Sequence, residues 1–283
     1  MIIQKNILIP GREGRPIALD IFYKDMAPRP LVIYTHGFNG FKDWGNFDII
    51  ATQFAEAGFC FVKFNFSHNG TTPEQYDELV DMDAFSKNNY TTEVNELQTV
   101  IDWLLSKENP HRAVIKEEKT FLIGHSRGGG IVLLKGAEEQ RTKAIAAWAS
   151  VAECKTPWGS WPQERLEQWK QKGVDYFTNS RTGQQMPLHY QLYEDYQNNK
   201  ERLNIIGATG RLKIPLLICH GTEDEPVPVS HAHALHDANR EAELFLVKSD
   251  HVFGRKHPWK ENYLPEPMQE VVSKTIQFFQ AIP

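Results

Sequence analysis

The chain has 283 residues, 41% hydrophobic and 24% charged, which allows a normal buried core in one large domain or two small ones. A formal net charge of −5 without a dense basic run argues against a nucleic-acid-binding surface. No apolar stretch approaches the roughly 20 residues of a membrane span. The N-terminus lacks a secretory-signal pattern, and three cysteines without metal-ligand spacing fit a reducing compartment, so a cytoplasmic location is expected.

Short apolar runs alternate with helical patterns along most of the chain. Strands are predicted at 2–9, 17–23, 31–34, 59–64, 144–149, 214–219 and 244–247, with a central strand before residue 124. Helices are predicted over 47–57, 91–105, 230–239 and 266–281, the second beginning near Thr92 and Glu93. This alternation is typical of an α/β fold, with a mostly parallel central sheet and helices on both faces.

The pattern changes between residues 152 and 207. This segment is polar, rich in tryptophan and tyrosine, and interrupted by Pro157, Pro162 and Pro187. Helices are expected within it, for instance over 162–172 and 188–202. We interpret it as a mainly helical lid inserted into a core of residues 1–151 and 208–283. Such an insertion overhangs the carboxyl ends of the strands, where ligands bind.

The most informative stretch is 121–134, where an apolar run ends at Gly124 and a second begins after Gly128. Ser126 lies midway, which predicts a strand, a sharp turn and a helix with the serine at the apex. A serine held in a strained conformation crowds the residues two before and two after it, so both must lack Cβ. The alternative, a phosphate-binding loop, lacks the Lys-Ser/Thr pair and the G-x-G-x-x-G spacing.

A serine nucleophile needs a base and an acid that orients the base, expected in loops after later strands in the order Ser, Asp/Glu, His. Asp224 follows the strand at 214–219 and is the candidate acid, with Glu223 and Glu225 as substitutes. His251 follows the strand at 244–247 and is the candidate base. His257 is its nearest competitor.

An oxyanion hole requires backbone N–H groups aimed at the developing negative charge. The N–H of Arg127, directly after Ser126, is one candidate, and the N–H of Phe38, after His36-Gly37, is the other. No ligand spacing links His36, His125 and His220, so loop packing explains these histidines better than metal binding. No cofactor or metal is expected.

These motifs together resemble the α/β-hydrolase-fold serine hydrolases, and most of all the cinnamoyl/feruloyl-esterase-like and dienelactone-hydrolase-like members. The matching stretches are 36–38, 124–129, 220–228 and 250–253, in the family's order. Dienelactone hydrolases proper carry a cysteine at the position of Ser126. Asn65 and Ser67 stand where many relatives have an acid and an arginine, which distinguishes this chain from them.

The resemblance implies acyl transfer through a Ser126–His251–Asp224 triad on a small-molecule ester, such as a hydroxycinnamoyl or short acyl ester. A serine peptidase of the aminopeptidase or oligopeptidase type is the near alternative, and a non-catalytic binding protein on this fold is another. The lid aromatics either wall a substrate pocket or pack the lid. The charged residues of this segment that are candidates for contact with the substrate are Lys155, Glu164, Arg165 and Arg181. The sequence leaves the oligomeric state open, a homodimer included.

Overall fold

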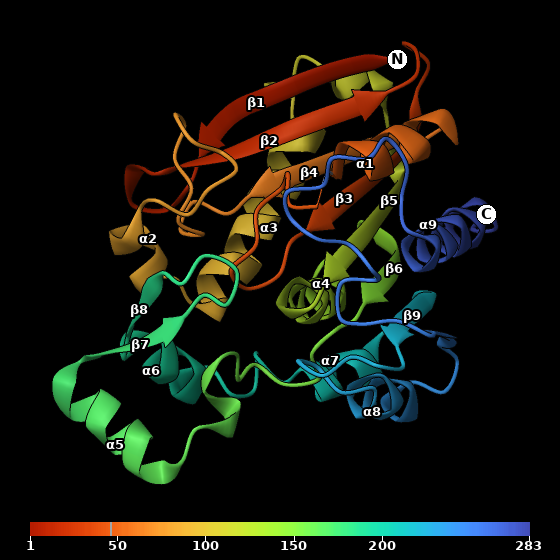
Figure 1. Cartoon of the computed structure of the whole chain (residues 1–283). Coiled ribbons are helices and arrows are strands. Elements are labelled where there is room, and N and C mark those ends of the chain that lie inside the picture. The colour runs from red at the N-terminus through yellow and green to blue at the C-terminus, as the bar shows by residue number, and fades with distance from the viewer. Residues whose placement is uncertain (46) are drawn as a thin grey trace.

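The computed structural model describes residues 1–45 and 47–283. Among them, eight strands form one sheet in the order β1-β2-β4-β3-β5-β6-β9-β10 (Figure 1). The pairs β1–β2 and β2–β4 are antiparallel and the remaining pairs are parallel, so the mostly parallel sheet is confirmed. The strands are β1 (Ile2–Pro10), β2 (Pro16–Tyr23), β3 (Arg29–Thr35), β4 (Cys60–Asn65), β5 (Ile115–His125), β6 (Thr142–Trp148), β9 (Leu216–Gly221) and β10 (Glu243–Val247).

Helices cover both faces of this sheet because each presents one apolar side to it. On one face, α1 (Phe47–Glu56) and α9 (Glu266–Gln280) pack around a core that includes Phe54 and Phe279. On the other face lie α3 (Tyr90–Leu105), α4 (Arg127–Glu138) and α8 (Ser230–Ala238). Figure 1 shows α3 and α4 on the opposite side of the sheet from α9.

Two local details differ from the sequence-based expectation. The helix α3 is capped by Asn89, whose side chain accepts a hydrogen bond from the Thr92 N–H at 2.8 Å, so the start predicted near Thr92 is one turn late. The short helix α2 (Met82–Ser86) was not predicted. Its five residues are too few to show a helical period, and only the Asp81 side chain, which caps it, marks its start.

The segment between β6 and β9 contains a β-hairpin as well as helices. Its elements are α5 (Gln163–Lys172), β7 (Val174–Thr178), β8 (Gln185–His189), α6 (Gln191–Asn198) and α7 (Ile205–Arg211). The helix predicted over 188–202 is therefore wrong at its start, because residues 185–189 pair with β7. Gly173 ends α5 and Gly183 lies in the turn of the hairpin. Both have a positive φ, 75° and 73°, which glycine adopts without steric cost.

Aromatic packing holds this segment together. Trp169 is fully buried, and its indole N–H donates to the Leu188 carbonyl at 2.7 Å. Trp158, Trp161 and Tyr190 surround it with ring centres 5.3–6.2 Å away. These rings therefore pack the insertion together. This is one of the two hypotheses made from the sequence for the aromatic residues of this segment. In Figure 1, α5, α6, β7 and β8 gather on one side of the molecule.

The helix α7 behaves differently from the rest of the segment, since it packs against α4 and α8 of the core. The helix begins at Ile205, before the end of the insertion predicted at residue 207, so the last residues of the predicted insertion pack with the core. Among the helices of the described residues, none combines the length and the apolar composition that a membrane span requires. The three cysteines are unpaired and buried.

Candidate active site

Ser126 lies at the sharp turn between β5 and α4, with φ 58° and ψ −121°. Its N–H donates to the Trp148 carbonyl at 2.9 Å, which fixes the turn against the neighbouring strand β6. A Cβ on Gly124 would lie 2.1 Å from the Gly128 carbonyl oxygen, and one on Gly128 would lie 2.3 Å from the Thr35 oxygen. Neither position has room for a side chain, as the sequence predicted.

Ser126, His251 and Asp224 come together from the loops after β5, β10 and β9. Ser126 Oγ lies 2.9 Å from His251 Nε2, and His251 Nδ1 lies 2.7 Å from Asp224 Oδ2. A Cβ on Gly221 would lie 2.3 Å from the Ser249 carbonyl oxygen, so this glycine lets the loops after β9 and β10 approach each other. That approach brings Asp224 within reach of His251.

Asp224 is buried and is held from three sides. Its Oδ1 accepts from the Val227 N–H at 2.8 Å, and its Oδ2 lies 3.2 Å from His220 Nε2 as well as beside His251. Burial would raise the pKa of Asp224, but the hydrogen bonds from His220 and His251 outweigh it and hold the pKa far below its usual range. The carboxyl is therefore ionised at neutral pH. The alternative acid Glu223 is exposed and lies 3.9 Å from Lys248.

Two further histidines support the site in their neutral form. His125 Nε2 lies 2.8 Å from the backbone oxygen of His251, and burial together with the charges of His251 and Arg255 lowers its pKa. Burial lowers the pKa of His36 to about 4. His36 Nδ1 donates to the Gly37 carbonyl at 2.9 Å, so this ring holds the loop after β3. Both rings therefore contact backbone oxygens of loops next to Ser126.

The loop after β3 passes directly over Ser126. A Cβ on Gly37 would lie 2.9 Å from Ser126 Cβ, so only glycine allows this approach. Phe38 follows it in the chain, and Arg127 is the first residue of α4, where backbone N–H groups have no partner within the helix. For the residues described, no hydrogen bond from the N–H of Phe38 or Arg127 to another backbone group is found.

Ser126 and His251 open onto a cavity of about 860 Å³. Its wall includes Phe38 from the loop after β3, Val227 from the loop after β9, and Phe177 from the hairpin of the insertion. Phe38 and Phe177 face each other with ring centres 5.1 Å apart. The Ser126 hydroxyl and the His251 ring therefore border a space of small-molecule size with a partly aromatic wall.

The sequence profile of the prolyl oligopeptidase family matches residues 46–258, most of the chain. The chain belongs to the prolyl oligopeptidase family. Its fold is the α/β-hydrolase fold. Est1E from Butyrivibrio proteoclasticus superposes with a TM-score of 0.70 at 16% identity, covering 98% of this chain and 100% of that one. The α/β hydrolase GrgF from Penicillium sp. sh18 gives 0.70 at 17% identity, over 100% and 99%.

A curated sequence relative is an uncharacterized 31.7 kDa protein from Escherichia coli, encoded in the traX-finO intergenic region. It is 28% identical over 124 residues, which are 44% of this chain. The chain spans only 38% of the length of that relative. The likeness to Est1E and GrgF, both below 20% identity, shows the fold and not the substrate.

In this family member, the side chain of Arg127 packs against α3 and is not among the residues that line the cavity. Its Nε donates to Glu93 Oε2 at 2.8 Å, and its guanidinium lies 3.7 Å from the centre of the Tyr90 ring. Both members of the ion pair are buried. The pair therefore ties the start of α4, and with it the turn at Ser126, to α3.

The charged residues proposed for substrate contact separate into two groups. Lys155 and Arg181 line the cavity at Ser126. Glu164 and Arg165 line a different hollow within the insertion, where Arg165 pairs with Asp175 at 2.9 Å. His257, the competing base, packs edge-on against Phe41 with ring centres 4.9 Å apart and accepts from the Gly45 N–H.

The polar residues of the loop after β4 are structural. Asn65 Oδ1 accepts from the Lys42 N–H at 2.6 Å, and Ser67 N–H donates to Glu96 at 2.9 Å. Nearby, Asp20, Asp43 and Asp48 present carboxylates within 4.8 Å of one another. The buried amines of Lys42 and Lys63 and the amine of Lys5 pair with these acids, so three cations offset the three carboxylates.

The positions of two residues at the site were not predicted from the sequence. His220 was assigned to packing, although it also lies against Asp224; its place at the end of β9, four residues before Asp224, was the available signal. Arg255 lines the cavity and is buried. Its sequence context, Gly254-Arg255-Lys256, is that of an exposed basic loop, so no local signal marked it.

Proposed function

We propose that this protein is a serine hydrolase that cleaves carboxylic esters through an acyl-enzyme on Ser126. The observation that carries this proposal is the unbroken pair of contacts from Ser126 Oγ through His251 to Asp224, at 2.9 and 2.7 Å, beside a cavity large enough for a small ester. Nucleophile, base and orienting acid are the groups that acyl transfer to a hydroxyl requires.

In the proposed mechanism, Asp224 holds the proton of His251 on Nδ1, which leaves Nε2 free to accept the Ser126 proton. Ser126 Oγ then attacks the ester carbonyl, and the N–H groups of Phe38 and Arg127 donate to the oxyanion. His251 passes its proton to the leaving alcohol. A water molecule, deprotonated by His251, attacks the acyl-enzyme, and His251 returns that proton to Ser126 Oγ as the acid leaves.

We further propose that the acyl group is short or aromatic, of the hydroxycinnamoyl kind. The facing rings of Phe38 and Phe177 support an aromatic or aliphatic group next to Ser126. The insertion, residues 152–207, would act as the lid, since it supplies Phe177 and Lys155 to the cavity wall. Est1E, which shares the fold, has been solved with ferulic acid bound, and this supports the class.

Peptide or amide cleavage is the second candidate, and the match to the prolyl oligopeptidase family favours it. The same groups would serve, because both reactions pass through a tetrahedral intermediate at a carbonyl. Glu153 and Glu225 line the cavity and would be the groups available to a substrate amine.

Turnover of 4-nitrophenyl butyrate and of aminoacyl 4-nitroanilides tests these candidates side by side. We expect kcat/KM for the ester to exceed that for every anilide, and Ser126→Ala to abolish ester turnover while its thermal unfolding stays close to that of the wild type. A preference for the anilides would favour the peptidase. Near-normal activity of Ser126→Ala would contradict the role of Ser126 in either reaction.

A further inference from the structure

The β7–β8 hairpin of the insertion touches the loop that follows β3. Asn179, directly after β7, is 3% exposed, and its side-chain N–H donates to Asn39 Oδ1 at 3.2 Å. Two residues before it, Phe177 faces Phe38 with ring centres 5.1 Å apart. All four residues line the cavity at Ser126. The insertion therefore contacts, at two adjacent positions, the loop that carries one of the proposed oxyanion donors.

Hydrogen bonds within the hairpin fix the position of Asn179. Its backbone N–H donates to the Gln184 carbonyl and its backbone carbonyl accepts from the Gly183 N–H, both at 2.8 Å. Its side-chain oxygen accepts from the Arg181 N–H at 3.0 Å. The side-chain NH2 group is therefore left for a contact outside the hairpin, and this is the group that bonds Asn39.

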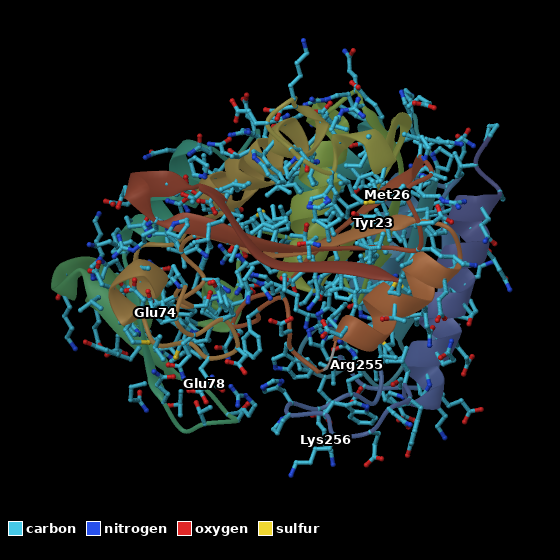
Figure 2. All side chains as sticks on the ribbon, turned by 90° about the horizontal axis from the view of Figure 1, so that it is seen from above. Tyr23, Met26, Glu74, Glu78, Arg255 and Lys256 are labelled. Carbon is cyan, nitrogen blue, oxygen red and sulfur yellow. The ribbon has the colours of Figure 1, made fainter. Side chains whose placement is uncertain are left out.

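The hairpin has its own attachment to the core, separate from Asn39. β8 packs against α2, and the side-chain N–H of Gln184 donates to the Leu79 carbonyl at 3.3 Å. The Phe177 ring centre lies 6.3 Å from that of Phe85 in α2. Figure 1 shows β8 next to α2, and Figure 2 shows Glu78, the neighbour of Leu79, on the same side of the molecule as the hairpin. The hairpin can therefore support the loop after β3 from a fixed position.

Residues 37–40 of that loop form a tight turn, in which the last N–H donates to the first carbonyl at 3.1 Å. Asn39, the third residue of the turn, has φ 59°, a left-handed conformation that asparagine tolerates better than most residues. On the core side, the side chain of Asn69 donates to the Gly40 carbonyl at 3.2 Å. Because Phe38 is the second residue of this turn, the direction of its N–H depends on the conformation of the turn.

The contact from the insertion supports the strained position of this turn. A residue other than glycine with a positive φ keeps that conformation only where its surroundings hold it. A hydrogen bond from the buried amide of Asn179 to the Asn39 side chain opposes relaxation of the turn. Oxyanion donors stabilise a transition state only while they stay at hydrogen-bond distance from the developing charge. A looser turn would therefore weaken the donor at Phe38.

We propose that Asn179 is a positioning residue, which acts through Asn39 to hold the Phe38 N–H in the oxyanion hole. This inference rests on the ester hydrolase function proposed above. It gives the insertion a part in the chemical step, in addition to its contribution of Phe177 and Lys155 to the cavity wall. Loss of the contact should then lower kcat with little change in KM, because the oxyanion forms only during the reaction.

Asn179→Ser tests this directly, because serine can still accept from the Arg181 N–H but is too short to reach Asn39. Removal of an oxyanion donor costs roughly 10²- to 10³-fold in kcat, and a loosened donor should cost less. With 4-nitrophenyl butyrate, and with active sites titrated by a fluorophosphonate, we expect kcat to fall about 5- to 30-fold and KM to change by less than about 2-fold. Gln185→Ala is the matched control, since it removes an exposed hydrogen bond to Thr178 within the same hairpin, and it should change kcat by less than about 2-fold.

Two measurements distinguish positioning from a general structural defect. An alkyl trifluoromethyl ketone forms a tetrahedral adduct with a serine nucleophile, and its oxyanion would lie in the proposed hole. Its inhibition constant should therefore rise in Asn179→Ser by about the factor lost in kcat/KM. In a double-mutant cycle, Asn39→Gly tolerates the positive φ but lacks the acceptor, so it should lower kcat by a similar factor. Adding Asn179→Ser to it should then cost less than about 2-fold more.

Each outcome decides the question. A normal kcat per titrated site in Asn179→Ser, with or without a lower unfolding temperature, would overturn the inference while ester hydrolysis stands. Losses in the two single variants that multiply in the double variant would overturn it as well. A wild-type protein that neither cleaves the ester nor reacts with the fluorophosphonate would refute the proposed function, and this inference with it.

Discussion

Replacing Asp224 with asparagine should greatly reduce activity while leaving the structure of the site intact. The Val227 N–H donates to Oδ1 at 2.8 Å, so it orients the new amide with the oxygen toward Val227 and the NH2 group toward His251. That NH2 group would then face His251 Nδ1 across a contact that is 2.7 Å in the native protein. The histidine can accept this hydrogen bond only by carrying its proton on Nε2, and Nε2 can then no longer accept the proton of Ser126.

The expected loss follows from this change of tautomer and from the lost charge beside the imidazolium. It is about 10³- to 10⁴-fold in kcat, or about 4 to 5.5 kcal/mol of transition-state stabilisation. The assay is steady-state hydrolysis of 4-nitrophenyl butyrate, with thermal unfolding as a check on the fold. Glu223→Gln is the matched control, because it removes an exposed carboxylate one residue away, and it should change kcat by less than about 2-fold. An Asp224→Asn enzyme with more than a tenth of normal activity, or a large loss in Glu223→Gln, would refute the reasoning.

Two further predictions concern stability. Glu93→Gln leaves the buried Arg127 guanidinium without its counter-charge and should lower the free energy of unfolding by about 3 to 5 kcal/mol in urea titrations; Glu153→Gln, in an exposed pair, should cost less than about 1 kcal/mol. The pKa of His36, about 4 against an ordinary 6.5, means that the unfolded chain binds an extra proton between these values, so wild-type stability should fall as pH drops from 6.5 to 4. The His36 share is at most roughly 3 kcal/mol, and His36→Gln should show a correspondingly flatter pH dependence. An equal slope in both proteins would contradict the burial argument.

The sheet and the turn at Ser126 could be predicted because their signals are local. Buried parallel strands read as short apolar runs, and the two glycines at positions 124 and 128 are required by contacts of 2.1 and 2.3 Å that no side chain could tolerate. The polar loops after β9 and β10 could also be located, because each follows a short apolar strand. Their order along the chain then pointed to the loops that meet at Ser126.

The rest depended on tertiary contacts. Three consecutive acids follow β9, and nothing in the spacing distinguishes them; the Val227 N–H and His220 hold Asp224 inward, while Glu223 and Glu225 remain exposed. The β7–β8 hairpin was missed because its strands are only five residues each, too short to show a clear alternation of apolar and polar residues. The burial of Arg255 is produced by Trp44 and Phe47, which lie over 200 residues earlier in the chain.

The catalytic role of Ser126 is the central claim, and covalent labelling tests it most directly. The intact protein should gain the mass of one fluorophosphonate adduct, and peptide mass spectrometry should place that adduct on Ser126. Ser126→Ala should gain none, and His251→Ala should react far more slowly, since the hydroxyl then lacks its base. A folded wild-type protein that stays unlabelled, or an adduct on another residue that persists in Ser126→Ala, would contradict the account.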